Sequence, residues 1–227
     1  MSIFNSLSNI LPFFGAVLGM GIGYKMPSKS PNGLKLILSF SGAFLLGITI
    51  FHLMPEAFSK VNSKPGLWIV CGIILQILLE YLSQGTEHGH SHIKSNEFLP
   101  WLLFISLCLH AFIEGLPLGH ESSLVWGIFI HKIPIGMVLF YMIWNTKNSK
   151  VLKITALFIF AIMSSLGSIT LEHSDTFQNY QTQITAIVLG MLLHISTTIL
   201  FESNQGHAFN IRKLLSILLA FLISYFI

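Results

Sequence analysis

Charged residues are scarce in this sequence. Asp, Glu, Lys and Arg make up 9% of its 227 residues, whereas a soluble domain usually carries about 25%. So few charges cannot cover a water-facing surface, and a hydrophobic content of 53% excludes an intrinsically disordered chain. The net charge of +3 is small and scattered, so no nucleic-acid partner is expected. A mean hydropathy of +0.74 indicates a polytopic membrane protein in contact with the lipid bilayer.

Cysteine is also rare, with Cys71 and Cys108 as its two occurrences. Both lie in apolar runs, fit no paired metal-binding spacing and imply no disulfide framework. They are interpreted as small buried hydrophobic residues. The N-terminus lacks the basic region of a signal peptide, so the first apolar segment is expected to be retained.

Long apolar runs fill most of the sequence. A membrane-spanning helix needs about 20 mostly apolar residues, and eight runs approach that length. They predict an all-α membrane protein, an eight-helix bundle that forms a single transmembrane domain over residues 1–227. The predicted spans are residues 8–24, 34–58, 66–83, 98–119, 124–144, 151–171, 183–201 and 210–227. In the first run, Gly15, Gly19 and Gly23 recur every four residues and predict a smooth face for close helix packing.

The basic residues predict the orientation. In an eight-span topology, Lys60 and Lys64 face the side of the termini, and Lys132 falls within a span. Because Lys and Arg accumulate in cytosolic linkers, both termini are expected outside the cytosol, in a cell membrane and most simply a bacterial inner membrane. Nine of the 12 basic residues lie on the opposite, cytosolic side: Lys25, Lys29, Lys35, Lys94, Lys147, Lys150, Lys153, Arg212 and Lys213.

The fourth run contains an ionisable pair, His110 and Glu114. An ionisable side chain at the bilayer centre costs at least ~2.5–3.5 kcal/mol, so each is a candidate for function. Four residues apart on a helix, the two side chains lie about 40° apart around the axis and about 6 Å apart along it. Imidazole nitrogen and carboxylate oxygen are suitable ligands for a divalent transition metal. The alternative is a structural hydrogen-bonded pair.

The fifth run contains His131 at a similar depth, followed by Lys132. Two neutral histidines and one carboxylate would leave a bound Zn²⁺ incompletely neutralised, with an open coordination position that suits transient binding. Lys132 is expected either to pair with Glu114 or to extend to the membrane surface. Pro117 and Pro134 are each expected to free a backbone carbonyl that could contact an ion.

Three further residues are weaker candidates for metal contact. His52 and Glu56 repeat the four-residue spacing near the outer end of the second run, and predict an auxiliary ligand pair, an ion entry point or a solvated helix end. His194 lies in the middle of the seventh run, as an auxiliary ligand or as a hydrogen-bonded structural residue.

A His-rich segment occupies the linker at residues 84–97, on the cytosolic side of the predicted topology. His88, His90 and His92 alternate with small residues, and such a pattern can chelate Zn²⁺, Ni²⁺ or Cu²⁺. The segment is interpreted as a weak metal-capture loop, with a merely polar loop as the alternative.

Three motifs in register resemble the ZIP (Zrt/Irt-like) family of metal-ion transporters. HAFIEG at residues 110–115 is similar to the family's fourth-helix motif, and HKIPIG at 131–136 is similar to its fifth-helix motif. HLMPEA at 52–57 is similar to its second-helix motif. The resemblance covers nearly the whole chain.

The resemblance implies import of Zn²⁺, or in some members Fe²⁺ or Mn²⁺, toward the cytosol. It implies a transport site on the fourth and fifth helices, with His110, Glu114 and His131 as primary ligands. It also implies elevator-like sliding of a mobile helix group against a scaffold. Ala111 and Ile135 stand where the family carries ligands, and Lys132 stands where binuclear members carry a carboxylate. These departures argue against a two-metal centre.

The first functional hypothesis is therefore a divalent metal-ion transporter, with zinc uptake into the cytosol as its most specific form. Binding should weaken at acidic pH, because coordination needs neutral histidine and ionised carboxylate. The alternative is a non-transporting membrane metal sensor or receptor with a degenerate site. An enzyme is disfavoured because the sequence lacks the His-Glu-x-x-His arrangement of a metalloprotease. No cofactor is expected beyond the metal substrate, and a homodimer is left open.

Overall fold

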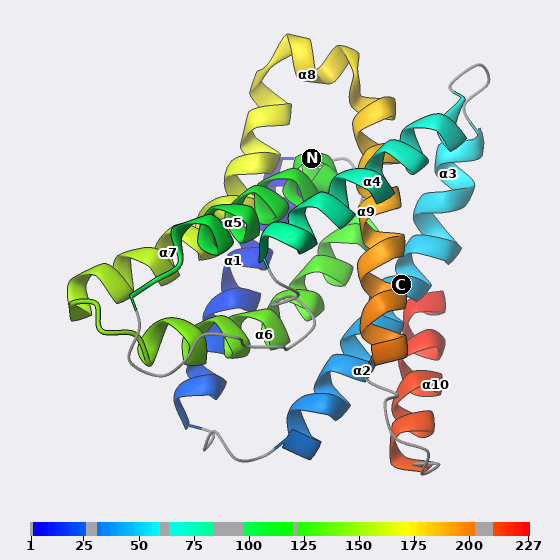
Figure 1. Cartoon of the computed structure of the whole chain (residues 1–227). Coiled ribbons are helices and arrows are strands. Elements are labelled where there is room, and N and C mark those ends of the chain that lie inside the picture. The colour runs from blue at the N-terminus through cyan, green and yellow to red at the C-terminus, as the bar shows by residue number, and fades with distance from the viewer. Residues whose placement is uncertain (1, 26–30, 60–63, 84–97, 120–121, 203–210) are drawn as a thin grey trace.

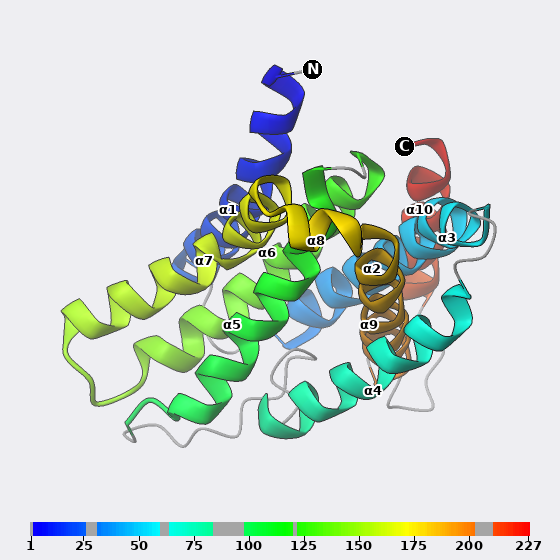
Figure 2. The same ribbon diagram turned by 90° about the horizontal axis from the view of Figure 1, so that it is seen from above.

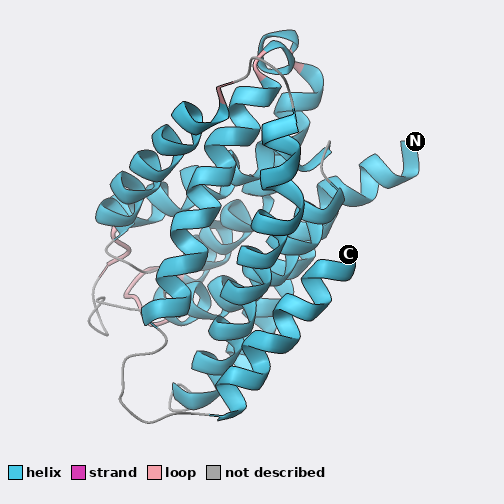
Figure 3. Cartoon of the chain, turned by 90° about the vertical axis from the view of Figure 1, so that its right-hand side faces the viewer, coloured by secondary structure: helices cyan, strands magenta, loops and turns pink. Residues whose placement is uncertain are grey.

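The computed structural model describes residues 2–25, 31–59, 64–83, 98–119, 122–202 and 211–227, which form helices joined by short loops (Figure 1). Within these ranges no strand occurs (Figure 3). The elements are α1 (Ser2–Lys25), α2 (Pro31–Ile48), the π-helix η1 (Thr49–Leu53), α3 (Met54–Ser59), α4 (Pro65–Ser83), α5 (Trp101–Gly115), the 3-10 helix η3 (Leu116–Gly119), α6 (Ser122–Trp144), α7 (Lys150–His173), α8 (Asp175–Asn179), α9 (Gln181–Glu202) and α10 (Ile211–Phe226). The prediction of an all-helical fold is confirmed.

Six helical segments of the described chain are long and apolar enough to cross a membrane. They are Gly33–Ser59, which joins α2, η1 and α3, then α4, α5 with η3, α6, α7 and Gln181–Phe201 in α9. Helices α1 and α10 are not among them. The 16 residues of α10 reach about 24 Å, which is shorter than the hydrocarbon core of about 30 Å. The eight-span topology therefore stays a prediction.

Within the described part of the chain, the buried apolar residues form two clusters. One joins α1, α5, α7 and the second half of α6, and contains Leu107 and Phe160. The other joins α2, η1, α3, α4, α9 and α10 with the first turns of α6, and contains Phe44 and Leu192. We call these sets the α1–α5–α6–α7 group and the α2–α4–α9–α10 group. They lie side by side in two perpendicular views (Figures 1 and 2).

Glycines bring pairs of helices into backbone contact. A Cβ atom on Gly15 or Gly19 of α1 would overlap a main-chain oxygen of α6, at Phe129 and Ile133 respectively. The close-packing face predicted on the first run is thereby confirmed. Glycines also face main-chain oxygens of the partner helix between α4 and α9, and between α5 and α7. Small residues at such contacts allow close van der Waals packing where the lipid supplies no hydrophobic driving force.

Prolines set the irregular turns. Pro55 cannot donate a backbone hydrogen bond, and its ring would collide with the carbonyl four residues earlier. The chain widens into the π-helix η1 just before it, at Thr49–Leu53. Similarly, α5 ends at Gly115 and continues as the 3-10 helix η3, which contains Pro117. The π-helix contains His52 and precedes Glu56, and the 3-10 helix follows Glu114.

Candidate metal centre

Three ionisable residues converge between α5 and α6. His110 and Glu114 lie one turn apart on α5, His131 lies on α6, and all three are buried. One ligand atom from each lies within 4.8 Å of the other two. His110 Nε2 is 3.2 Å from Glu114 Oε2, and the two imidazole centroids are 6.5 Å apart. The structure thus brings together the residues proposed from sequence as primary ligands.

A hydrogen bond from α4 orients the imidazole of His110. Its Nδ1 donates to Oε1 of the buried Gln76 at 3.0 Å. With the proton on Nδ1, the neutral ring directs the lone pair of Nε2 toward the Glu114 carboxylate. Nitrogen and oxygen then face each other as two acceptors, an arrangement that a cation between or beside them relieves. Such outer hydrogen bonds fix tautomer and ring orientation in metal sites.

Lys132 contacts the second oxygen of the Glu114 carboxylate. Its ammonium forms an ion pair with Glu114 Oε1, and both side chains are inaccessible to solvent. The same nitrogen lies 4.6 Å from the ring centroid of Phe160 on α7, in a cation–π contact. Of the two arrangements left open by the sequence, the structure shows pairing with Glu114 and no extension to the surface. The buried carboxylate is therefore balanced by a cation of the protein itself.

Ser164 on α7 completes the surroundings of Glu114. Its hydroxyl lies 3.2 Å from Glu114 Oε1 and 2.9 Å from the Ala111 carbonyl oxygen, so it can donate to either acceptor. Ser164 is fully buried in the tight contact of α5 with α7. The Glu114 carboxylate is thus contacted by Lys132 of α6, by Ser164 of α7 and by His110 of its own helix.

The carbonyls next to the two prolines have donors in the protein. The Ile113 carbonyl, four residues before Pro117, accepts from the backbone N–H of Leu116. The Ile130 carbonyl, four residues before Pro134, accepts from the Ser41 hydroxyl of α2 at 3.5 Å. Both carbonyls are engaged within the protein, so the structure gives no support to their expected role as ion ligands.

Two positions where the motifs depart from the ZIP pattern are apolar and buried. Ile135 is 3% exposed and belongs to the hydrophobic cluster of the α1–α5–α6–α7 group. Ala111 is fully buried in the same cluster. Neither side chain offers a ligand atom, so the described centre has the donor set of His110, Glu114 and His131.

The candidate pair near the outer end of the second run does not join this centre. His52 lies in η1, and its Nε2 donates to the backbone oxygen of Ser224 on α10 at 2.7 Å. Glu56 lies in the first turn of α3 and is half-buried. Among the described residues, the convergent group of potential ligands contains neither of them.

His194 likewise has a partner elsewhere. Its Nε2 is 2.6 Å from Glu80 Oε2, and this contact joins α9 to α4 within the α2–α4–α9–α10 group. Both side chains are about one-fifth exposed, at 22% and 23%. His88, His90 and His92 of the predicted metal-capture loop lie outside the described residues.

Gln76 and Ser164 were not predicted from the sequence as residues of the site. Gln76 carried a usable signal, because it is a lone amide in an apolar run, four residues before Glu80 and therefore on the same helix face. Ser164 carried none, because serine is common in membrane helices and its partner lies on another helix.

Comparison with known proteins identifies the family of the chain. Residues 81–227, more than half of the chain, match the family model described as ZIP zinc transporter. The chain belongs to the ZIP zinc transporter family. The matched segment of this ZIP chain begins in the last turn of α4 and includes α5 and α6, which carry the convergent residues.

Individual relatives are similar over shorter segments. Protein zntD of Dictyostelium discoideum is 35% identical over 105 residues, which cover 38% of this chain and 15% of that protein. The zinc transporter ZIP13 homolog of Drosophila melanogaster is 37% identical over 71 residues, which cover 28% of this chain and 20% of that protein. Zinc transporter ZIP13 of Pongo abelii is 27% identical over 157 residues, which cover 59% of this chain and 46% of that protein. In each case the similarity spans less than half of the relative's length.

Proposed function

We propose that this chain carries a divalent metal ion, with zinc as its substrate, through the membrane into the cytosol. The ion binds at one site formed by His110, Glu114 and His131. The convergence of these ligand atoms within 4.8 Å in a buried position carries the proposal. Membership of the ZIP zinc transporter family and the names of the similar proteins support zinc as the substrate.

The charges around the site favour brief binding. Two neutral imidazoles and one carboxylate leave a divalent ion undercompensated, and the Lys132 ammonium beside Glu114 adds a further positive charge. Three protein ligands also leave a coordination position open for water or for an incoming ligand. A transporter must release what it binds, and an undercompensated ion in an incomplete coordination shell is released readily.

The predicted orientation of the chain supports the direction of transport that we propose. In the eight-span topology with both termini outside, nine of the 12 Lys and Arg residues face the cytosol. The His-rich segment at residues 84–97 lies on the same side in this topology. A metal released toward the cytosol would meet this segment, which suits weak capture on exit.

The two helix groups offer a way to expose the site alternately. The three ligands belong to α5 and α6, whereas Gln76, which orients His110, belongs to α4 of the other group. A second hydrogen bond, from the Ser106 hydroxyl to the Leu79 carbonyl at 2.6 Å, also joins α5 to α4. We propose that the α1–α5–α6–α7 group slides against the α2–α4–α9–α10 group, and that these contacts break and re-form during transport.

A non-transporting metal receptor is the second candidate. Two observations favour it: Ile135 fills part of the apolar core where the ZIP motif carries a ligand, and Lys132 pairs with a carboxylate of the site. A receptor needs selective binding without release across the membrane. The distinction therefore depends on measured flux.

Zinc entry into proteoliposomes that contain the purified chain and a trapped fluorescent zinc indicator distinguishes the candidates. The proposal predicts saturable entry of zinc. Fe²⁺ or Mn²⁺ should inhibit this entry only when its concentration exceeds that of zinc. A His110→Ala/Glu114→Ala double variant should give the leak of empty liposomes. Zinc binding without flux by the wild type would support the receptor, and equal flux by the double variant would refute the site.

A further inference from the structure

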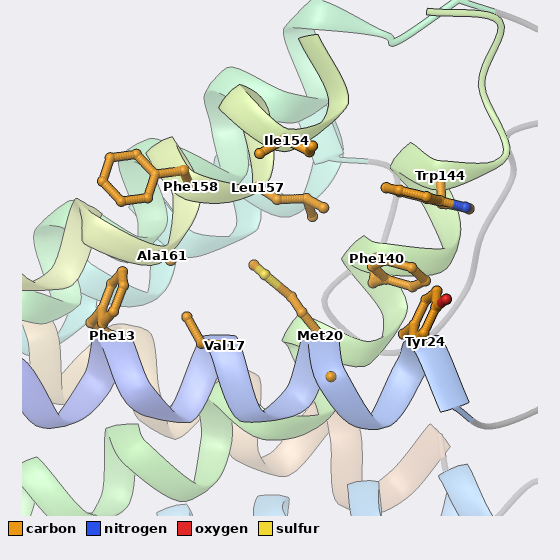
Figure 4. Close-up of a pocket in the computed structure, with 11 residues that line it drawn as sticks. Phe13, Val17, Met20, Tyr24, Phe140, Trp144, Ile154, Leu157, Phe158 and Ala161 are labelled. Atoms are coloured by element: carbon orange, nitrogen blue, oxygen red, sulfur yellow. The ribbon is translucent and has the colours of Figure 1, made fainter. Parts of the chain in front are cut away.

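An apolar groove runs along the outer face of the α1–α5–α6–α7 group, between α1, α6 and α7 (Figure 4). Its volume is about 410 Å³, within the range of small-molecule pockets. Its walls include Phe13, Val17, Met20, Phe140, Leu157 and Phe158. Val17 and Phe158 are 43% and 55% exposed, so the groove opens sideways, where a membrane protein meets lipid.

One end of the groove is aromatic and carries polar tips. Phe140 stacks on Trp144 with centroids 5.1 Å apart, and Tyr24 meets the edge of Phe140 at 6.0 Å. In Figure 4 the indole nitrogen of Trp144 and the hydroxyl of Tyr24 lie at this same end, away from Phe13. Tyr and Trp concentrate where the hydrocarbon core meets the lipid headgroups. The groove therefore runs from the headgroup level into the hydrocarbon region.

One lysine contacts this aromatic end, and three more lie at the neighbouring helix ends and in the α6–α7 loop. The Lys153 ammonium donates to the Trp144 carbonyl oxygen at 2.7 Å and lies 5.9 Å from the Trp144 ring centroid. Lys25 ends α1 and Lys150 begins α7, so both lie at the same ends of the helices that line the groove. Lys147 lies in the short loop that joins α6 to α7.

We propose that the groove binds one anionic phospholipid of the surrounding membrane. An acyl chain lies along α1, α6 and α7, and the phosphate lies at the aromatic end near Lys153, within reach of the lysines and of the Trp144 and Tyr24 polar tips. The cytosolic leaflet is the side that this orientation predicts, because the same lysines belong to the cytosolic set.

Charge favours a lipid over a second copy of the chain in this groove. Two copies related by an axis along the membrane normal would place the Lys25, Lys147, Lys150 and Lys153 ends of both molecules side by side. Like charges oppose that arrangement, whereas a phosphate neutralises them. The occupant suited to both the apolar walls and the basic mouth is an amphiphile with a negative headgroup.

Native mass spectrometry of the purified chain tests the proposal. The chain is incubated in detergent micelles with equimolar phosphatidylglycerol and phosphatidylcholine of identical acyl chains, and the retained lipids are counted. The wild type should retain one phosphatidylglycerol in preference to phosphatidylcholine. Equal retention of the two lipids, or retention of neither, would overturn the proposal.

Two glycines provide a matched pair of variants. A Cβ atom on Gly21, which lines the groove, and one on Gly66 of α4 would each meet no atom within 4 Å. Gly21→Phe should fill the groove and abolish retention, whereas Gly66→Phe should retain the lipid as the wild type does. Val17→Trp provides a second block, so the test does not depend on one variant folding. Retention unchanged by both blocking variants would contradict the proposal.

The headgroup contact has its own control. Lys153→Gln should weaken the preference for phosphatidylglycerol about fivefold, the effect expected of one basic residue near an anionic headgroup. Lys35→Gln removes an exposed charge from the same predicted side, on α2 away from the groove, and should leave the preference unchanged. Equal losses in the two variants would indicate diffuse attraction and refute a site. A dimer that Gly21→Phe dissociates would assign the groove to a second copy.

Discussion

His110 on α5 is hydrogen bonded to Gln76 on α4, with Nδ1 and Oε1 3.0 Å apart and both side chains at most 1% exposed. The bond joins the two helix groups at the candidate metal centre. It also fixes which nitrogen of His110 faces Glu114. Gln76, which is not a proposed metal ligand, therefore sets the orientation of His110, which is a proposed ligand.

Gln76→Leu should weaken zinc binding and zinc flux about 10–100-fold, the usual cost of losing such an orienting partner. The physical reason is that the freed His110 ring can adopt the other tautomer or turn away from Glu114. Zinc titration of the purified variant and flux in proteoliposomes measure the effect. Ser106→Ala is the control, because it removes another α5–α4 hydrogen bond without touching His110. Equal losses in both variants would mean that only the helix contact matters.

Lys132→Met should strengthen zinc binding by about tenfold or more, because it removes a positive charge from beside the bound ion. The same change leaves Glu114 without its ion-pair partner, so the metal-free protein should unfold at a lower temperature. Calorimetric zinc titration and thermal unfolding in detergent, with and without zinc, measure both effects. Lys35→Met, an exposed change of equal charge, should alter neither. Weaker zinc binding by Lys132→Met would show that the ammonium supports the site.

Gly19→Ala should destabilise the protein by about 1–3 kcal/mol, as expected for an atom added at a close contact. Its Cβ atom would overlap the Ile133 carbonyl and push α1 from α6 next to His131. Zinc flux should therefore fall with thermal stability. Gly21→Ala, two residues further along α1, meets open space and should match the wild type in both measurements. Unchanged thermal stability and zinc flux in Gly19→Ala would contradict the close packing of α1 on α6.

His194→Gln should retain zinc flux, whereas His110→Gln should lose it. In this account His194 joins α9 to α4 through Glu80 at 2.6 Å, and a glutamine amide can still donate to that carboxylate. His110 supplies a metal ligand, which an amide replaces poorly in a zinc site. Parallel flux measurements on the two variants decide the matter. Loss of flux in His194→Gln at unchanged thermal stability would make His194 an auxiliary ligand.

Much of the fold was predictable because a bilayer leaves little choice. Each long apolar run must satisfy its backbone hydrogen bonds internally, and each folds as a helix. The glycines at positions 15, 19 and 23 also predicted a close helix contact, although not its partner α6. The π-turn at Thr49–Leu53 was not predicted, because the effect of Pro55 depends on how the neighbouring turns absorb its ring.

The candidate centre was predictable only in part, because some of its contacts depend on how separate helices pack. Spacing places His110 and Glu114 on one helix face, and the motifs add His131. The spacing of Lys132 could not decide between Glu114 and the membrane surface, because that depends on how α6 is rotated against α5 and α7. Gln76 lies on a helix more than thirty residues away in sequence, and only the packing of α4 on α5 reveals the contact.

Zinc flux into proteoliposomes, compared between the wild type and His131→Ala, is the sharpest test of whether the ion passes through this centre. His131 lies on a different helix from His110 and Glu114, so the variant leaves that pair intact and removes only the ligand that closes the site. In His131→Ala, flux should fall to the leak of empty liposomes while thermal stability in the absence of zinc is retained. Zinc flux of wild-type rate through a folded His131→Ala protein would contradict this prediction.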